Sequence, residues 1–431
     1  MQRQVYFDNA STTVLDPAVL KAMMPYFQKE YGNPSNLYEL GRQARLAIAR
    51  GTLTIATAIS CRADEFIFTG SATESDNLAI IGAARAHKKN GNRIIISNLE
   101  HKGIMSACEA LEKEGFEIIK LPVGKNGLLD PSEVKKVLNE KTIIVSVTMA
   151  DSETGTLQPI AEIGKLIRSF RGDKTLPYFH TDASQSAAYA DINVQKLGVD
   201  LLTLSAHKLG GPKGIGGLFV RHGVKLEPLI YGGGQQGRLR SGTENVPCIV
   251  GFGVAVDLNE KRKKAGMAKV KKMRNALEKG IFKSISKVVL NGHPTKRLPN
   301  FLNISILDIE GESMLLELDR HGIMINTGSA CNSESLEPSY VLTALGNPYE
   351  FVHGSIRFTL GTENNMADVK YVLKHLPRIV ERLRRISPLN LSIDQNKAMS
   401  DPRAFIGNQT PHFLRKKHKN EKDKIKTQQE T

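Results

Sequence analysis

Residues 199–217 read VDLLTLSAHKLGGPKGIGG, and this stretch indicates the class of fold that we expect. The apolar run Val199–Ser205 is typical of a buried strand. His207 and Lys208 follow it directly, and a glycine-rich turn comes next. In a parallel sheet, the carboxyl ends of the strands are where ligands bind. We therefore expect an α/β protein with a binding site at this edge of its sheet.

Strand and helix patterns alternate over the first 250 residues. Short apolar runs predict further strands at Glu65–Phe68, Arg93–Ser97, Glu117–Leu121, Thr142–Thr148 and Tyr178–Asp182. Between them, apolar residues recur at helical spacing, as at Ile104, Cys108 and Leu111. Because strands that alternate with helices form crossover units, the pattern predicts a mostly parallel sheet with helices on both faces.

The pattern changes after about residue 255, which predicts a second, smaller α+β domain. Its elements are a charged helix at Asn259–Lys279, strands at Phe301–Leu307, Met324–Asn326 and Ser355–Thr359, and helices near Gly311–Asp319 and Met366–Arg385. We predict a large domain at 14–255 and a small domain made of 1–13 and 256–389. A loop at about 325–340 belongs to the small domain, and 390–431 forms a basic tail that we expect to be disordered.

Composition excludes several classes of protein. The chain has 431 residues and a formal net charge of +15. No apolar run is long enough to span a membrane, and the first residues lack the apolar stretch of a secretory signal. The four cysteines, at positions 61, 108, 248 and 331, form no CxxC pair and are too few for a disulfide scaffold. We therefore expect a cytoplasmic protein.

The tail concentrates positive charge between Arg415 and Lys426. This segment holds seven basic and two acidic residues. Such a block of like charges is most simply a solvated segment, since its charges repel one another. The alternative is a docking arm for nucleic acid or for an acidic partner protein.

Three segments suggest the chemistry, and each also has a simpler explanation. Lys208 could be a solvated surface residue, or it could form a Schiff base with an aldehyde. Asp182 at a strand end could cap a helix, or it could pair with the pyridinium nitrogen of pyridoxal phosphate. The run Phe68–Asn77 (FTGSATESDN) could be an ordinary helix start, or its free N–H groups could bind a phosphate.

Taken together, these segments resemble the class V branch of fold-type I pyridoxal-phosphate enzymes. The stretch Thr327–Leu342 (TGSACNSESLEPSYVL) is similar to the long catalytic loop of NifS/IscS-like cysteine desulfurases. Further shared motifs are Tyr6–Ala10, Glu100–Lys102, Gly232–Gln235, Arg240–Asn245 and Ser355–Phe358. The resemblance extends from Val5 to Pro388. It implies a fold-type I transferase with a mostly parallel seven-stranded sheet, a smaller α+β domain, and a homodimer.

The resemblance also implies a role for individual residues. Lys208 would bind the cofactor covalently, Asp182 would pair with its ring nitrogen, and His101 would stack on the ring and act as an acid or base. The ring hydroxyl would contact Gln185 and Ser152. The phosphate would be held by Ala72, Thr73, Ser205 and His207, with Thr243 from the neighbouring subunit. Arg357, with Asn33, would bind the substrate carboxylate, because the planar guanidinium matches a carboxylate.

Cys331 would be the catalytic thiol. Its thiolate would attack the sulfur of bound L-cysteine, release L-alanine and keep the sulfur as a persulfide. The acceptor would be a protein of Fe–S cluster assembly or of tRNA or DNA thiolation. No resident metal is expected, although Cys331 could transiently ligate an Fe–S cluster. Two alternatives are a selenocysteine lyase or other class V enzyme, and a weakly active partner protein of a sulfur pathway.

One departure from the family pattern falls in the predicted site. The family usually has two asparagines where this chain has Asp151 and Ser152. A lost hydrogen bond of this kind typically costs about 0.5–1.5 kcal/mol. The departure therefore predicts a slower enzyme rather than an inactive one.

Overall fold

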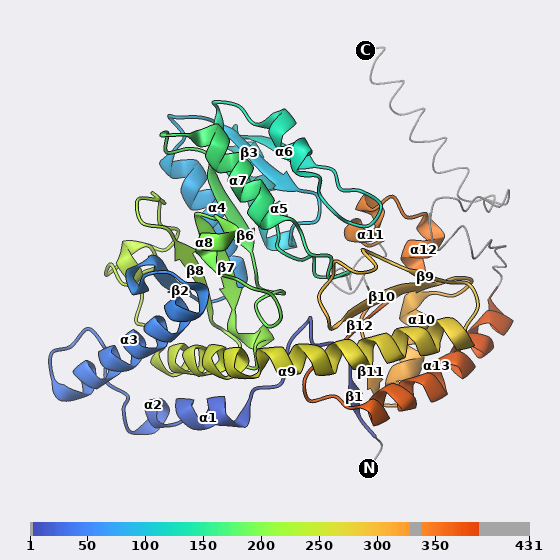
Figure 1. The fold of residues 1–431 in the computed structure, drawn as a ribbon. Helices are drawn as coiled ribbons and strands as arrows, with labels where there is room; N and C mark the ends of the chain where they lie inside the picture. Colours follow the sequence, from blue (N-terminus) through green and yellow to red (C-terminus); the bar gives the residue numbers. More distant parts are fainter. Residues whose placement is uncertain (1–2, 328–337, 388–431) are drawn as a thin grey trace.

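The computed structural model describes residues 3–327 and 338–387, and its centre is a seven-stranded sheet (Figure 1). The strand order is β2-β8-β7-β6-β5-β3-β4. The strands are β2 (Phe66–Thr69), β3 (Arg93–Ser97), β4 (Glu117–Leu121), β5 (Thr142–Ser146), β6 (Tyr178–Asp182), β7 (Leu201–Ser205) and β8 (Gly216–Val220). All pairs are parallel except those that β8 makes with β2 and β7. The predicted α/β class is confirmed.

Helices cover both faces of this sheet. On one face, α4 (Ala72–Ala86) and α5 (Lys102–Lys113) pack on apolar side chains such as Ile94 and Ile144. On the other, α3 (Glu39–Ile59) and α7 (Ile160–Arg171) pack on Phe179 and Leu202. The connecting segments contain α6 (Pro131–Val137), α8 (Val194–Leu197) and the short helices η1 (Ala63–Glu65), η2 (Ala206–Lys208) and η3 (Gln236–Arg238).

A second core lies beside the first. Strands β12 (Ser355–Thr359), β10 (Phe301–Ile306) and β9 (Val288–Leu290) form an antiparallel sheet in that order, and β1 (Val5–Tyr6) pairs in parallel with β11 (Ile323–Met324). Helices α10 (Gly311–Asp319) and α13 (Met366–Ile386) bury apolar residues against these strands. Shorter helices are α1 (Pro17–Met23), α2 (Pro25–Gln28), α11 (Tyr340–Ala344) and α12 (Tyr349–His353). The N-terminal strand thus packs with the elements of the smaller lobe.

Helix α9 (Val246–Ser284) runs past both cores, as Figure 1 shows along its length. The prediction placed this helix at Asn259–Lys279, which is too short at both ends. Its first half packs in the core of the large sheet through Phe252 and Val256, and its second half packs in the smaller lobe through Val270 and Leu277. The predicted domain boundary at residue 255 therefore falls inside one continuous helix.

Strand β8 contradicts the predicted glycine-rich turn from Gly216 onwards. A Cβ at Gly216 would lie 2.5 Å from the carbonyl carbon of Ser71 and 2.7 Å from the amide nitrogen of Ala72. Glycine is needed here because two backbones meet closely, not because the chain turns. Most other predicted strands differ from the observed ones by one or two residues at an end. Within the described ranges, no helix has the length and apolar character that crossing a membrane requires.

Candidate active site

The predicted catalytic residues gather at the carboxyl edge of the large sheet. Asp182 is the last residue of β6, and Ser205 is the last residue of β7. Lys208 follows β7 within η2, and His101 caps the start of α5 after β3. Because these parallel strands are close neighbours in the sheet, their ends bring the side chains to one place.

Asp182, His101 and Lys208 are close enough to influence one another electrically. Burial lowers the pKa of His101, the negative charge of Asp182 raises it, and the positive charge of Lys208 lowers it again. His101 Nδ1 accepts the backbone N–H of Gly103 at 3.1 Å. The ring is therefore neutral near pH 7, and its proton is on Nε2. Asp182 is buried, and its Oδ1 accepts the N–H of Ser184 at 2.8 Å.

A cavity lies between the start of α4 and the end of β7. Its volume is about 380 Å³, and its walls include Ser71, Ser205, His207 and Lys213. Ala72 and Thr73 begin α4, so free backbone N–H groups and the positive end of the helix dipole lie beside this cavity. Burial, helped by the charges of Lys208 and Lys213, lowers the pKa of His207 to about 4, so this ring is neutral. The donor set fits the phosphate of pyridoxal phosphate.

Buried acids surround Asp182, and sequence reasoning missed their role. Burial, reinforced by the charge of Asp182, raises the pKa of Asp76 well above its usual range. Burial also raises the pKa of Glu100 to about 8, although Ser97 and the Thr148 N–H donate to its carboxyl. Burial therefore favours the protonated forms of Asp76 and Glu100.

His180 lies two residues before Asp182 on β6, and its ring contacts two hydroxyl groups and the carboxyl group of Asp76. Its Nδ1 lies 2.9 Å from Ser146 Oγ, and its Nε2 lies 3.0 Å from Thr203 Oγ1 and 3.7 Å from Asp76 Oδ1. Burial lowers the pKa of His180 to about 4. Asp76 and Glu100 both stand in sequence motifs quoted above, but the shifts of their pKa values depend on burial, which those motifs do not reveal.

Arg357, in the middle of β12, is held by hydrogen bonds to the N-terminal segment and to Ser152. Its Nη2 donates to Asp8 Oδ1 at 2.7 Å and to Ser11 Oγ at 3.0 Å, and its Nη1 donates to the carbonyl of Ser152 at 2.6 Å. Among the described residues, the buried Nε has no hydrogen-bond partner. An unsatisfied buried guanidinium nitrogen is costly, so it fits a ligand that carries a carboxylate.

Asp151 and Ser152, which depart from the family pattern, each make hydrogen bonds within this part of the chain. The buried carboxylate of Asp151 accepts backbone N–H groups of Glu153, Thr154 and Thr156 at 2.6–3.1 Å. Asp151 thus closes its own turn. Ser152, predicted to contact the cofactor through its hydroxyl, contributes its carbonyl to Arg357.

Two predicted residues lie on the outside of this chain. Asn33 is exposed between α2 and α3, where its Oδ1 accepts the N–H of Ser35 at 2.9 Å. Thr243 is exposed in the loop before α9. Neither lines the cavity beside Ser205. Gln185 is half-buried, and its Nε2 donates to the carbonyl of Ala10 at 3.1 Å.

Cys331 lies outside the described residues, but the chain on either side of it is described. Before it, Asn326 Nδ2 donates to Asp8 Oδ2 at 3.2 Å. After it, Ser339 Oγ lies 2.5 Å from Glu153 Oε2, and the Tyr340 hydroxyl donates to the Glu100 carbonyl at 2.8 Å. Both ends of the segment therefore contact residues of the candidate site.

Comparison with known proteins defines the class. The family model Aminotransferase class-V matches residues 5–372, so the chain belongs to this family of pyridoxal-phosphate enzymes. It is 46% identical to cysteine desulfurase IscS of Dictyoglomus turgidum, over 92% of this chain and 100% of that protein. The predicted activity, a pyridoxal-phosphate-dependent cysteine desulfurase, is confirmed.

Solved structures agree with this assignment. A NifS-like protein superposes with a TM-score of 0.83 at 32% identity, covering 88% of this chain and 100% of that one. The structure titled "SspA in complex with cysteine" superposes with a TM-score of 0.73 at 33% identity, covering 84% of this chain and 100% of that one.

Proposed function

We propose that Lys208, Asp182 and His101 bind pyridoxal phosphate and that Cys331 receives the sulfur of L-cysteine. The observation that carries this proposal is the meeting of these three side chains at the sheet edge, next to the cavity at Ser205 and His207. Bound pyridoxal phosphate supplies an electron-withdrawing ring that weakens bonds near the substrate α-carbon. All further steps depend on the protein's own residues.

The electrostatics of the site suit this division of labour. Asp182 lies near Asp76 and Glu100, whose charged forms burial disfavours, and its carboxylate can pair with a protonated ring nitrogen. Because Nδ1 of the neutral His101 ring accepts the Gly103 N–H, its Nε2–H is free to donate a hydrogen bond to a bound ligand. Arg357 would bind the substrate carboxylate, with Asp8 fixing its guanidinium.

In the sulfur-transfer step, the Cys331 thiolate attacks the sulfur of bound cysteine. The C–S bond breaks, its electron pair stays with carbon, and a proton taken up there gives alanine. The sulfur remains on Cys331 as a persulfide. The segments flanking Cys331 support this role because they contact Glu153, Glu100 and Asp8.

Substitution of the thiol tests this step against the alternatives. We expect Cys331→Ala to lower alanine formation from L-cysteine at least about 100-fold. Cys248→Ala, at a half-buried cysteine in α9, serves as the matched control and should stay within about twofold. Unchanged turnover in Cys331→Ala would favour a selenocysteine lyase or another class V enzyme.

Substitution of the lysine tests cofactor attachment. Lys208→Ala should abolish the visible absorbance of the protein-bound cofactor, which mass spectrometry of the intact protein can check independently. A native chain that binds no cofactor and releases no alanine would instead favour a weakly active partner protein.

We also propose that the enzyme is a homodimer. Large apolar side chains are exposed along residues 14–53, with Val14 at 64%, Leu37 at 80% and Leu53 at 60%, and Tyr231 is 71% exposed near the Thr243 loop. An apolar surface of this extent favours association, which would let Thr243 reach the partner's phosphate. Leu37→Glu should give monomers in sedimentation and weaker cofactor binding. Leu316→Glu, 63% exposed on α10, should do neither.

We propose that the sulfur acceptor is a protein of Fe–S assembly or of nucleic-acid thiolation. The transfer would take place in the reducing, cytoplasmic setting that a persulfide requires. The basic tail lies outside the described residues. Deleting 413–431 should lower sulfur transfer to the acceptor while alanine formation is unchanged. Equal transfer would remove the tail from this role.

A further inference from the structure

Almost all of the excess positive charge outside the tail belongs to two helices. Helix α9 contains ten Lys or Arg and three acidic residues, and α13 contains six and two, so together they carry a formal charge of +11. Residues 388–431 hold nine basic and five acidic residues. The chain is +15 overall, so residues 1–387 are also +11. The rest of the folded part is therefore electrically balanced.

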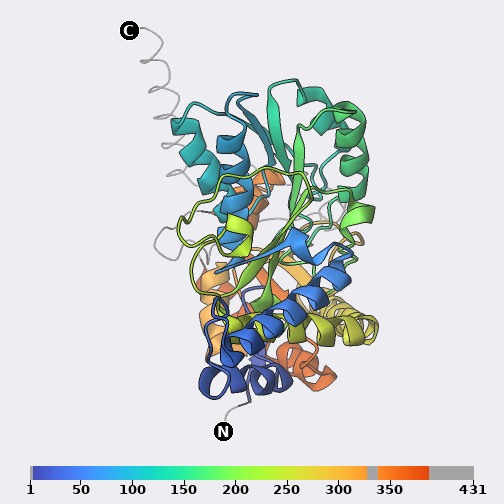
Figure 2. The same cartoon turned by 90° about the vertical axis from the view of Figure 1, so that its left-hand side faces the viewer.

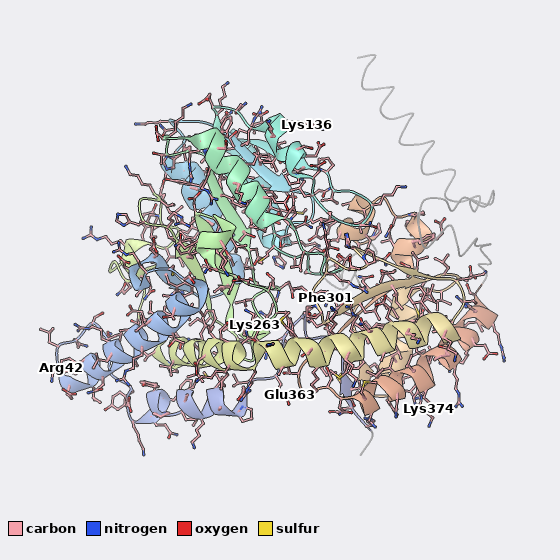
Figure 3. The ribbon with its side chains drawn as sticks, in the orientation of Figure 1. Arg42, Lys136, Lys263, Phe301, Glu363 and Lys374 are labelled. Atoms are coloured by element: carbon pink, nitrogen blue, oxygen red, sulfur yellow. The ribbon has the colours of Figure 1, made fainter. Side chains whose placement is uncertain are left out.

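The two helices lie side by side along one face of the molecule (Figures 1 and 2). Both bury apolar residues in the same core of the smaller lobe, among them Val270 and Leu277 from α9 and Val372 and Leu376 from α13. Their opposite sides therefore face solvent together. We call this surface the α9/α13 face. Lys374, labelled in Figure 3, lies at its outer edge.

The charges form stripes along this face. At 100° per residue, the exposed residues Lys264, Lys271, Lys272, Lys279 and Lys283 fall within one third of the circumference of α9. On α13, exposed cations recur every fourth residue at Lys370, Lys374, Arg378 and Arg382. That spacing is about 6 Å along the helix. Each stripe is a line of cations rather than a compact cluster.

Most cations of the two stripes pair with no carboxylate of the described residues. Lys261, Arg262, Lys263, Arg382 and Arg385 pair with carboxylates. Lys269 instead donates to the carbonyl of Thr362. Within the described parts of the chain, the other eight exposed cations have no carboxylate within ion-pair distance: Lys264, Lys271, Lys272, Lys279, Lys283, Lys370, Lys374 and Arg378. They are therefore available to a polyanion.

The composition of the α9/α13 face favours nucleic acid over an acidic protein. Protein interfaces are depleted in Lys and depend on aromatic or apolar anchors. Of the exposed large apolar side chains in the described residues, only Met366 and Ile386 belong to these helices, and they lie at the two ends of α13. Lysine binds phosphate as a point charge and requires no such anchor. The stripe from Lys264 to Lys283 is about 28 Å long, the length of roughly eight base pairs.

We propose that the α9/α13 face binds a nucleic-acid backbone without reading its sequence. The interaction involves phosphates and the eight cations without counter-ions, so its strength falls steeply with salt. It is separate from the sheet-edge site and does not depend on the basic tail.

The test compares two full-length holoenzyme variants of equal charge. The first carries Lys271→Glu, Lys272→Glu and Lys279→Glu on α9. The control carries Lys135→Glu, Lys141→Glu and Lys165→Glu, three exposed lysines of the large lobe. Each variant lowers the formal charge by six and keeps the tail. Binding to a fluorescent 20-base-pair RNA or DNA duplex is measured by anisotropy over a range of salt concentrations.

We expect the α9 variant to bind at least tenfold more weakly than the native chain, and the control to stay within about twofold. Its salt dependence should lose a slope of about three, one for each lysine. Alanine formation should be unchanged in both. If the α9 variant folds poorly, Lys370→Glu, Lys374→Glu and Arg378→Glu on α13 provide the same comparison.

Three results would overturn the proposal. One is a native chain that does not bind either duplex at 0.1 M salt. Another is equal affinity of the two variants, which would assign binding to the tail or to net charge. The third is tighter binding of polyglutamate or of phosphatidylserine vesicles than of the duplexes, which would identify an acidic protein or a membrane as the ligand.

Discussion

The carboxyl edge of the large sheet and the α9/α13 face use ionisable groups in opposite ways. At the sheet edge, burial disfavours the charged forms of Asp76, Glu100 and His180, which lie near the carboxylate of Asp182. On the α9/α13 face, cations remain charged and exposed, and their fields add. A buried charge acts strongly at a single atom, whereas exposed charges act weakly over a long surface.

The comparison predicts its largest effect at Asp182. Asp182→Asn keeps the shape of the side chain but removes the carboxylate that would pair with the cofactor ring nitrogen, and we expect kcat to fall about 100-fold or more. Steady-state alanine formation at saturating cofactor measures this. Asp191→Asn, at an exposed carboxylate that pairs with Lys196, should have no comparable effect. Similar losses in the two variants would contradict a special environment for Asp182.

A second prediction concerns the close approach of β8 to the phosphate cavity. Gly216→Ala places a methyl group against the backbone of Ser71 and Ala72, which cannot yield like a flexible side chain. We expect a loss of about 2–3 kcal/mol in the free energy of unfolding, together with weaker cofactor binding. Gly124→Ala, where the nearest atom would be 3.5 Å away, is the control for both measurements.

A third prediction uses a buried acid next to the Cys331 segment. Burial raises the pKa of Glu153 to about 8 from an ordinary value of 4.5; Asp151 raises it further, while Ser339, Arg357 and Lys102 oppose the shift. The native state therefore holds a proton that the unfolded chain releases. The stability from neutral Glu153 is complete below pH 4.5 and is lost as the pH rises towards 8.

Glu153→Gln removes this titration. Between pH 5 and pH 8, the free energy of unfolding of the variant should rise relative to that of the native chain by about 3 kcal/mol. Urea denaturation at the two pH values measures the difference. The exposed Glu140→Gln should show no such trend, and a constant gap for Glu153→Gln would show that Glu153 is ionised throughout.

The smallest effect is expected on the α9/α13 face. A single Lys271→Glu should change the free energy of unfolding by less than about 0.5 kcal/mol, because exposed charges are well screened. Thermal melts of Lys271→Glu and of the control Lys165→Glu should therefore nearly coincide. A large destabilisation by Lys271→Glu alone would mean that the lysine stripe contributes to the stability of the fold.

Much of the fold could be predicted from local pattern. Strands β3, β4, β6 and β12 and helix α10 were predicted with their observed bounds. Strand β8 was missed because Gly216 and Gly217 read as a turn, whereas their lack of side chains admits the neighbouring backbone. The first half of α9 was missed because it is apolar all round and shows no amphipathic stripe.

The candidate site also has residues that could be predicted from the sequence and properties that could not. Lys208, Asp182 and His101 follow from motifs, since each stands next to an identifiable strand or helix end. The raised pKa values of Asp76 and Glu100 come from burial, which arises only when the chain folds around the sheet. The α9/α13 face could not be predicted at all, because its two stripes are about a hundred residues apart in the sequence.

Helix α9 has a mechanical consequence. At about 58 Å, it contributes side chains to both hydrophobic cores, with Phe252 in one and Leu277 in the other. Neither core can unfold without exposing the half of α9 that packs in it. Thermal unfolding of the two lobes should therefore be one cooperative transition. For the same reason, any hinge between the lobes must either bend this helix or slide along it.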